Sequence, residues 1–149
     1  MHHVLVLHGP NLNALGTREP DIYGSIPLAE LDHRLHDLAK ELGCALETLQ
    51  SAHEGVLIDA LFGAVGRMDG VLLNPGGLTH TSVALRDAVV ATRLPVVEVH
   101  LTNPRRRESF RHMSFVSDVA VGVIQGFGPD SYFLGLRALA GHIRHGSQT

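Results

Sequence analysis

The chain has 149 residues, of which 44% are hydrophobic, and it carries a mild formal net charge of −3. This length suits one ordinary domain with its own core, and the charge favours neither nucleic acid nor an anionic membrane surface as a partner. The single cysteine, Cys44, lies in an apolar segment and is interpreted as a reduced core thiol of a cytoplasmic protein. No apolar run approaches the ~20 residues that span a bilayer, and residues 1–9 lack the cationic start of a signal peptide.

The first third of the chain predicts a strand, a long loop, a helix and a second strand. Residues 3–8 (HVLVLH) form the first apolar run of strand length. Residues 9–24 (GPNLNALGTREPDIYG) hold three glycines and two prolines, so we expect neither helix nor strand there. Residues 27–43 place leucines at helical spacing and end at a glycine, which predicts a helix. The second strand is expected over 44–50.

The rest of the chain repeats this alternation. Helices are expected over 54–68, 80–92 and 131–145, with a short one over 105–116. Strands are expected over 70–77, 94–101 and 118–128. Several of the strands are apolar on both faces, as in a parallel sheet covered by helices on both sides.

Five strand–helix repeats without a linker predict one α/β domain over residues 1–149. We expect a flavodoxin-like, doubly wound five-stranded parallel sheet in the order 2-1-3-4-5. The alternation alone does not determine that order. It does predict the place of a ligand, because ligands of such sheets bind beyond the carboxyl ends of the strands, where the strand order reverses.

Polar side chains gather where the predicted first, third and fourth strands end. Asn11 follows the first strand, Asn74 ends the third, and Glu98 and His100 end the fourth. Each alone is compatible with a turn or a solvated strand end, but together they indicate a site. Glu98 and His100 are two residues apart on a strand and face the same side, where a carboxylate can fix the tautomer of an imidazole and favour its protonated form.

Two neighbouring segments complete this expected site. The turn after Asn74 contains Gly77 and leads into a helix start, where free backbone N–H groups suit an anion or simply a tight turn. Residues 11–24 are long enough for a lid, and they carry Arg18 and Tyr23. A guanidinium beside a phenol favours the phenolate, a strong base, although a surface arginine and a packing tyrosine fit the pattern equally well.

Longer motifs are similar to those of one family. GPNLNALGTREPDIYG, HEG, NPGGLTHTSVALRDA, VEVHLTN and ESFRHMSF resemble type II 3-dehydroquinate dehydratases of the shikimate pathway, and the resemblance runs from residue 3 to about residue 140. It implies a flavodoxin-like fold and an anti elimination of water from 3-dehydroquinate, through an enolate, without metal or cofactor. It also implies a homo-oligomer, a dodecamer built from trimers.

The resemblance implies a role for each matching residue. Tyr23 corresponds to the base, Arg18 to the cation that activates it, Asn11 to the amide that steadies the enolate, and His100 to the acid, oriented by Glu98. The residues matching substrate-binding positions are Asn74, Gly77, His80, Asp87, Leu101, Thr102 and Arg111, with Asp87 reaching the site of a neighbouring subunit. This sequence departs from the family pattern at Ala52 and Phe115, and neither residue has one of the catalytic or substrate-binding roles named above.

Other functions fit parts of the sequence less well. A flavin- or nucleotide-binding module of the same fold is the alternative, but GFGPDS (126–131) lacks a second βαβ unit and the chain has no tryptophan. A receiver-like signalling domain would need acidic residues where His8 and Asn74 stand. We expect no metal site, and the single lysine, Lys40, on a charged helix face, does not favour an imine mechanism. The run Arg105-Arg106-Arg107 is interpreted as a solvated loop.

Overall fold

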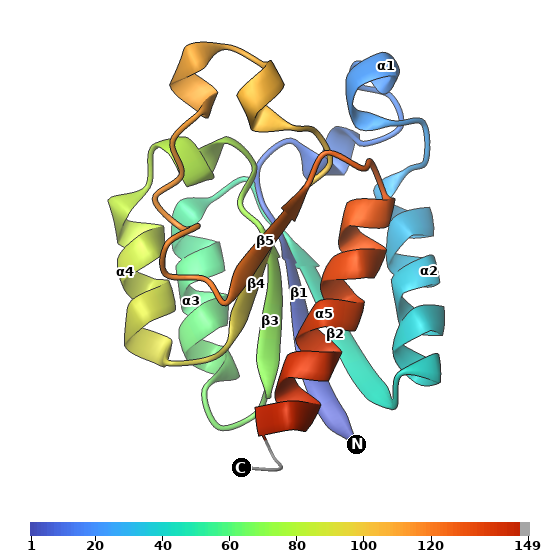
Figure 1. Ribbon diagram of the computed structural model, residues 1–149, viewed down its shortest axis with the longest axis vertical. Helices are drawn as coiled ribbons and strands as arrows, with labels where there is room; N and C mark the ends of the chain where they lie inside the picture. Colours follow the sequence, from blue (N-terminus) through green and yellow to red (C-terminus); the bar gives the residue numbers. More distant parts are fainter. Residues whose placement is uncertain (147–149) are drawn as a thin grey trace.

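A five-stranded parallel sheet forms the centre of the protein in the computed structural model, which describes residues 1–146 (Figure 1). The last three residues of the expected domain, 147–149, lie outside the described residues. The sheet has the order β2-β1-β3-β4-β5, so the predicted fold and strand order are confirmed. The strands are β1 (His2–His8), β2 (Cys44–Gln50), β3 (Gly70–Asn74), β4 (Val96–His100) and β5 (Gly122–Gln125).

Helices cover both faces of the sheet. The helices are α1 (Pro20–Tyr23), α2 (Leu28–Glu41), α3 (Glu54–Ala64), α4 (Val83–Thr92) and α5 (Asp130–Gly146). α2 and α5 lie on one face, and α3 and α4 lie on the other (Figure 1). Because side chains alternate along a strand, Val4 and Val6 of β1 pack towards α2 and α5, whereas Leu5 and Leu7 pack towards α3 and α4. None of the helices within residues 1–146 is both long and apolar enough to cross a bilayer.

A glycine lets α5 lie close to the sheet. Glycine in a helix interior costs about 1 kcal/mol relative to alanine. At Gly135, however, a Cβ atom would stand 2.6 Å from Cγ1 of Val99 and 2.9 Å from Cδ1 of Leu72. Glycine therefore lowers helix propensity at position 135, but the absence of a side chain allows α5 to lie in close contact with β3 and β4.

The structure differs from the expected elements in three loop segments. Residues 9–24 contain a 3-10 turn (Leu12–Ala14) and the one-turn helix α1, so the expectation of no helix there is wrong. The expected helix over 105–116 is wrong as well, since that region holds only two 3-10 turns, Pro104–Arg106 and Ser109–Arg111. The Asn103 side chain accepts a hydrogen bond from the backbone N–H of Arg105, a local bond that competes with helix continuation. β5 is shorter than the expected 118–128.

The loops after β1 and β3 are packed directly against each other. His8 pairs with Asn74 at the ends of the two strands, and the N–H of Gly9 donates to the carbonyl of Asn74 at 2.7 Å. A Cβ atom at Gly9 would stand only 2.4 Å from the carbonyl oxygen of Pro75. Glycine is therefore required at this position, where the strand order reverses.

Candidate active site

A cavity of about 310 Å³ opens at the carboxyl ends of β1, β3 and β4. Every predicted site residue except Glu98 and Asp87 lines it. The lining includes these predicted residues: Asn11, Arg18, Tyr23, Asn74, Gly77, His80, His100, Leu101, Thr102 and Arg111. The sheet order brings together side chains from residues 11–24 and from two strand ends that are far apart in the sequence.

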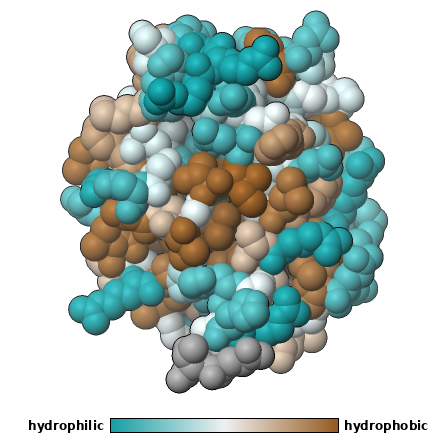
Figure 2. Space-filling model, viewed as in Figure 1, coloured by the Kyte–Doolittle hydropathy of each residue, from teal (hydrophilic) through white to brown (hydrophobic). Residues whose placement is uncertain are grey.

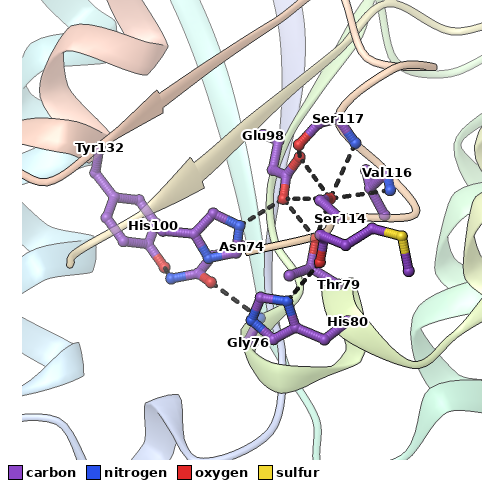
Figure 3. A network of polar contacts seen from close by, with 11 residues as sticks. Asn74, Gly76, Thr79, His80, Glu98, His100, Ser114, Val116, Ser117 and Tyr132 are labelled. Carbon is purple, nitrogen blue, oxygen red and sulfur yellow. Dashed lines mark hydrogen bonds and ion pairs between the residues drawn. The ribbon is translucent and has the colours of Figure 1, made fainter. Parts of the chain in front are cut away.

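The side chain of Glu98 is buried behind His100 and therefore does not line the cavity. Nε2 of His100 lies 2.5 Å from Oε2 of Glu98, which is fully buried (Figure 3). Because an ionised carboxylate can only accept, Nε2 carries the proton of a neutral His100 ring. Nδ1 is then the ring nitrogen that remains for a ligand.

Hydroxyl groups surround the same carboxylate. Thr79 Oγ1 donates to Oε2 of Glu98 and Ser117 Oγ donates to Oε1, each at 2.6 Å, and Ser114 Oγ lies 3.2 Å from Oε2 (Figure 3). Burial by itself raises the pKa of Glu98, but the hydrogen bonds from His100, Ser117 and Thr79 outweigh that effect and hold this pKa below its ordinary value. Glu98 is therefore ionised at neutral pH and fixes the orientation of His100.

Two guanidinium groups flank Tyr23. Nη2 of Arg107 donates to the Tyr23 hydroxyl at 2.8 Å, and the guanidinium carbon of Arg18 lies 4.5 Å from the ring centroid. The interpretation of residues 105–107 as a solvated loop is therefore wrong for Arg107, although Arg105 and Arg106 are exposed. Arg18 contacts the ring face, whereas the direct partner of the hydroxyl is Arg107.

The predicted substrate-binding side chains differ in how much of their hydrogen-bonding capacity is already used. Oδ1 of Asn74 accepts from the N–H of Gly76, and Nδ2 donates to the hydroxyl of Tyr132, both at 3.0 Å. Nδ1 of His80 donates to the carbonyl of Met113 at 2.7 Å, which leaves its other ring nitrogen for a ligand. Nε of Arg111 lies 2.5 Å from Oε2 of Glu108 at the rim.

The other predicted residues are placed as follows. Asn11 adopts a left-handed conformation (φ 72°) at the start of the 3-10 turn and exposes its side chain at the cavity. Leu101 and Thr102 line the wall that continues from β4, and a Cβ atom at Gly77 would meet no other atom within 4 Å. Asp87 lies on the exposed face of α4, outside this cavity.

Sequence reasoning missed the residues that support the site from loops. Arg107 is one of three adjacent arginines, and nothing in the pattern separates it from its two exposed neighbours. Ser114 and Ser117 carry no periodic signal, because the segment that contains them has no regular structure. Ser114 does lie in the motif ESFRHMSF, which marks its segment but not its contact with Glu98.

Comparison with known proteins identifies the family of this chain. The model of the family "Dehydroquinase class II" matches residues 2–140. The 3-dehydroquinate dehydratase of Gloeobacter violaceus is 60% identical over 141 residues, which cover 95% of this chain and 88% of that protein. The corresponding protein of Desulforudis audaxviator is 57% identical over 146 residues, which cover 98% and 97% of the two chains.

Solved structures give the same result. The type II dehydroquinase from Propionibacterium acnes superposes with a TM-score of 0.91 at 39% identity, covering 95% of this chain and 97% of that one. The type II dehydroquinase from Butyrivibrio crossotus gives a TM-score of 0.90 at 38% identity, with 93% and 97% covered. These comparisons offer no support for the alternative of a flavin- or nucleotide-binding module. They confirm the resemblance seen in the sequence: the chain belongs to the class II dehydroquinase family.

Proposed function

We propose that the protein is a 3-dehydroquinate dehydratase of the shikimate pathway, which leads to aromatic amino acids. It converts 3-dehydroquinate to 3-dehydroshikimate by anti elimination of water through an enolate, and the reaction needs neither metal nor cofactor. One observation carries the proposal: a tyrosine between two guanidinium groups and a carboxylate-backed imidazole line the same cavity. Relatives at 57% to 60% identity bear the name of this enzyme.

Tyr23 supplies the base. Its phenolate oxygen takes the proton from the carbon next to the ketone, and the electron pair of that C–H bond forms the enolate. A phenolate at this position has positive charge on two sides, from Arg107 at the oxygen and Arg18 at the ring face. Such preorganised charge stabilises anionic states more strongly in a partly enclosed cavity than in water.

Asn11 stabilises the enolate oxygen. Its side chain makes no capping hydrogen bond to the 3-10 turn that follows it, and Asn11 lines the cavity. We assign it an oxyanion-stabilising role, exerted through an ordered water molecule. Removing one such donor in other enzymes costs about 100- to 1000-fold in kcat.

His100 supplies the acid for the second half of the reaction. The enolate re-forms the ketone, its electron pair becomes the C=C bond of the product, and the C–O bond to the departing hydroxyl breaks. The imidazolium, which carries a proton on Nδ1 as well as on Nε2, gives the Nδ1 proton to that hydroxyl so that it leaves as water. Glu98 stabilises the imidazolium through the 2.5 Å contact to Nε2. Asn74, Gly77, His80 and Arg111, with the backbone N–H groups of Leu101 and Thr102, bind the hydroxyl groups and carboxylate of the substrate.

The protein assembles as a dodecamer of four trimers in this proposal and acts in the cytoplasm, where the buried thiol of Cys44 stays reduced. Figure 2 shows apolar side chains gathered over the middle of the face on which β5 forms the edge of the sheet. Val121 and Phe127, which flank β5, are 50% and 65% exposed. Exposed apolar patches at a sheet edge mark association surfaces. Asp87 then reaches the cavity of a neighbouring subunit, and light scattering of the purified protein measures the assembly directly.

A direct assay tests the reaction. Chelator-treated protein is mixed with 3-dehydroquinate, and the ultraviolet band of the conjugated product is followed. We expect the band to grow, and we expect Tyr23→Phe to lower kcat by about 100- to 10,000-fold while its circular dichroism spectrum stays that of the wild type. A wild-type protein that leaves the substrate unchanged, or a Tyr23→Phe variant with near-normal turnover, would contradict the proposal.

A further inference from the structure

A buried chain of polar side chains runs behind the cavity, and the mechanism above does not use it. His8 ends β1 and Tyr132 lies in the first turn of α5; both are fully buried. Nδ1 of His8 lies 2.8 Å from the Tyr132 hydroxyl, and Nε2 lies 2.7 Å from Oδ1 of Asp32 on α2. On the other side the Tyr132 hydroxyl accepts from Nδ2 of Asn74, whose Oδ1 accepts from Gly76 (Figure 3).

The direction of every hydrogen bond in this chain follows from its two ends, the backbone N–H of Gly76, which can only donate to Oδ1 of Asn74, and the carboxylate of Asp32. An ionised carboxylate can only accept, so Nε2 of His8 carries the proton. Because Nδ2 of Asn74 donates to the Tyr132 oxygen, the only hydrogen of that hydroxyl is donated to Nδ1 of His8. Burial raises the pKa of Tyr132 and keeps that hydrogen in place. The reverse tautomer of His8 would leave the Tyr132 hydrogen without an acceptor in a fully buried position.

The consequence reaches the cavity at Asn74. A Tyr132 oxygen that donates to His8 must accept from its other neighbour, so the NH₂ group of Asn74 faces Tyr132 and its carbonyl oxygen faces Gly76. One amide hydrogen then remains unused on a side chain that lines the cavity. The amide cannot turn over without breaking both bonds.

We propose that Asp32, His8 and Tyr132 are positioning residues that hold the Asn74 amide as a hydrogen-bond donor towards the cavity. The ligand group that such a donor recognises is an oxygen lone pair, as on a substrate hydroxyl or ketone. The inference rests on the proposed function for its kinetic consequence, but the direction of the hydrogen-bond chain is independent of any activity.

Kinetics test the consequence with one variant that removes a polar group and a control that removes none. Tyr132→Phe removes the hydroxyl alone, and we expect kcat/KM for 3-dehydroquinate to fall about three- to tenfold, mainly through KM, a modest coupling for residues in one network. Ile143→Val is the control: it trims another buried residue of α5 and should leave kcat/KM unchanged. Because Tyr132 acts through Asn74, Tyr132→Phe should cause no further loss in an Asn74→Ala background.

A spectroscopic measurement tests the direction of the chain without substrate. Nitrogen-15 NMR of the imidazoles, with the His8 signal assigned from its loss in His8→Asn, should show a proton on Nε2 and none on Nδ1. A proton on Nδ1, a wild-type kcat/KM in Tyr132→Phe, or additive losses in the double variant would each overturn the proposal. If the wild type itself does not convert 3-dehydroquinate, the proposed function fails, and the NMR result alone decides the direction of the chain.

Discussion

Replacing Arg107 by alanine should slow the reaction by one to two orders of magnitude. The guanidinium makes a 2.8 Å hydrogen bond to the half-buried Tyr23 hydroxyl. Hydrogen bonds to charged groups contribute about 1.5–3 kcal/mol. If Arg107 stabilises the phenolate in the rate-limiting state by that amount, a tenfold change in rate for each ~1.4 kcal/mol gives a fall in kcat/KM of about 12- to 140-fold.

The neighbouring arginine provides a matched control. Arg106 has the same charge, is exposed and does not line the cavity, so Arg106→Ala should keep kcat/KM within about twofold of the wild type. Arg107→Lys should fall between the two, because it keeps the charge but loses the planar donor geometry. The assay is the initial rate of product absorbance over a range of 3-dehydroquinate concentrations. Equal losses in Arg106→Ala and Arg107→Ala, or none in either, would refute a specific role of Arg107 at Tyr23.

Four further measurements address the acid, the buried carboxylate, the switch-point glycine and the thiol. His100→Ala should abolish dehydration but retain part of the exchange of the substrate α-proton with deuterium, seen by NMR; equal loss of both activities would contradict the division of roles. Hydrogen bonds lower the folded-state pKa of Glu98, so its stabilisation is complete above the ordinary carboxyl pKa of about 4.3 and is lost as the pH falls through the lower folded-state value. The difference in urea-unfolding free energy between wild type and Glu98→Gln should therefore shrink below about pH 4; a constant difference would exclude this linkage. Gly9→Ala should lower the unfolding free energy by about 1–3 kcal/mol, since its Cβ would overlap the Pro75 carbonyl, and wild-type stability would disprove that contact. Burial raises the pKa of the Cys44 thiol, so iodoacetamide should label the protein only in denaturant; rapid labelling of the native protein would show that the thiol is accessible.

The regular elements followed from the sequence because their causes are local. Helical spacing of leucines located α2 to within a few residues, and continuous apolar runs located β1 and β3 in the middle of the sheet. The errors fell in loops and at the β5 edge, where neither periodicity nor burial on both faces leaves a pattern. The 3-10 turns between Asn103 and Arg111 depend on single side-chain bonds such as that of Asn103, which hydrophobic spacing does not reveal.

The sequence by itself determined the fold class, the location of the site at the carboxyl ends of the strands, and the residue types gathered there. Each strand and the polar residues at its end are neighbours in the sequence, so a local pattern reveals both. Only the tertiary structure decided that Arg107, rather than Arg18, meets the hydroxyl of Tyr23 across 84 positions of the chain. It also decided that Asp32, His8 and Tyr132 align behind Asn74. Such contacts depend on how separate elements pack and on which donors and acceptors burial forces together, and neither is expressed in local spacing.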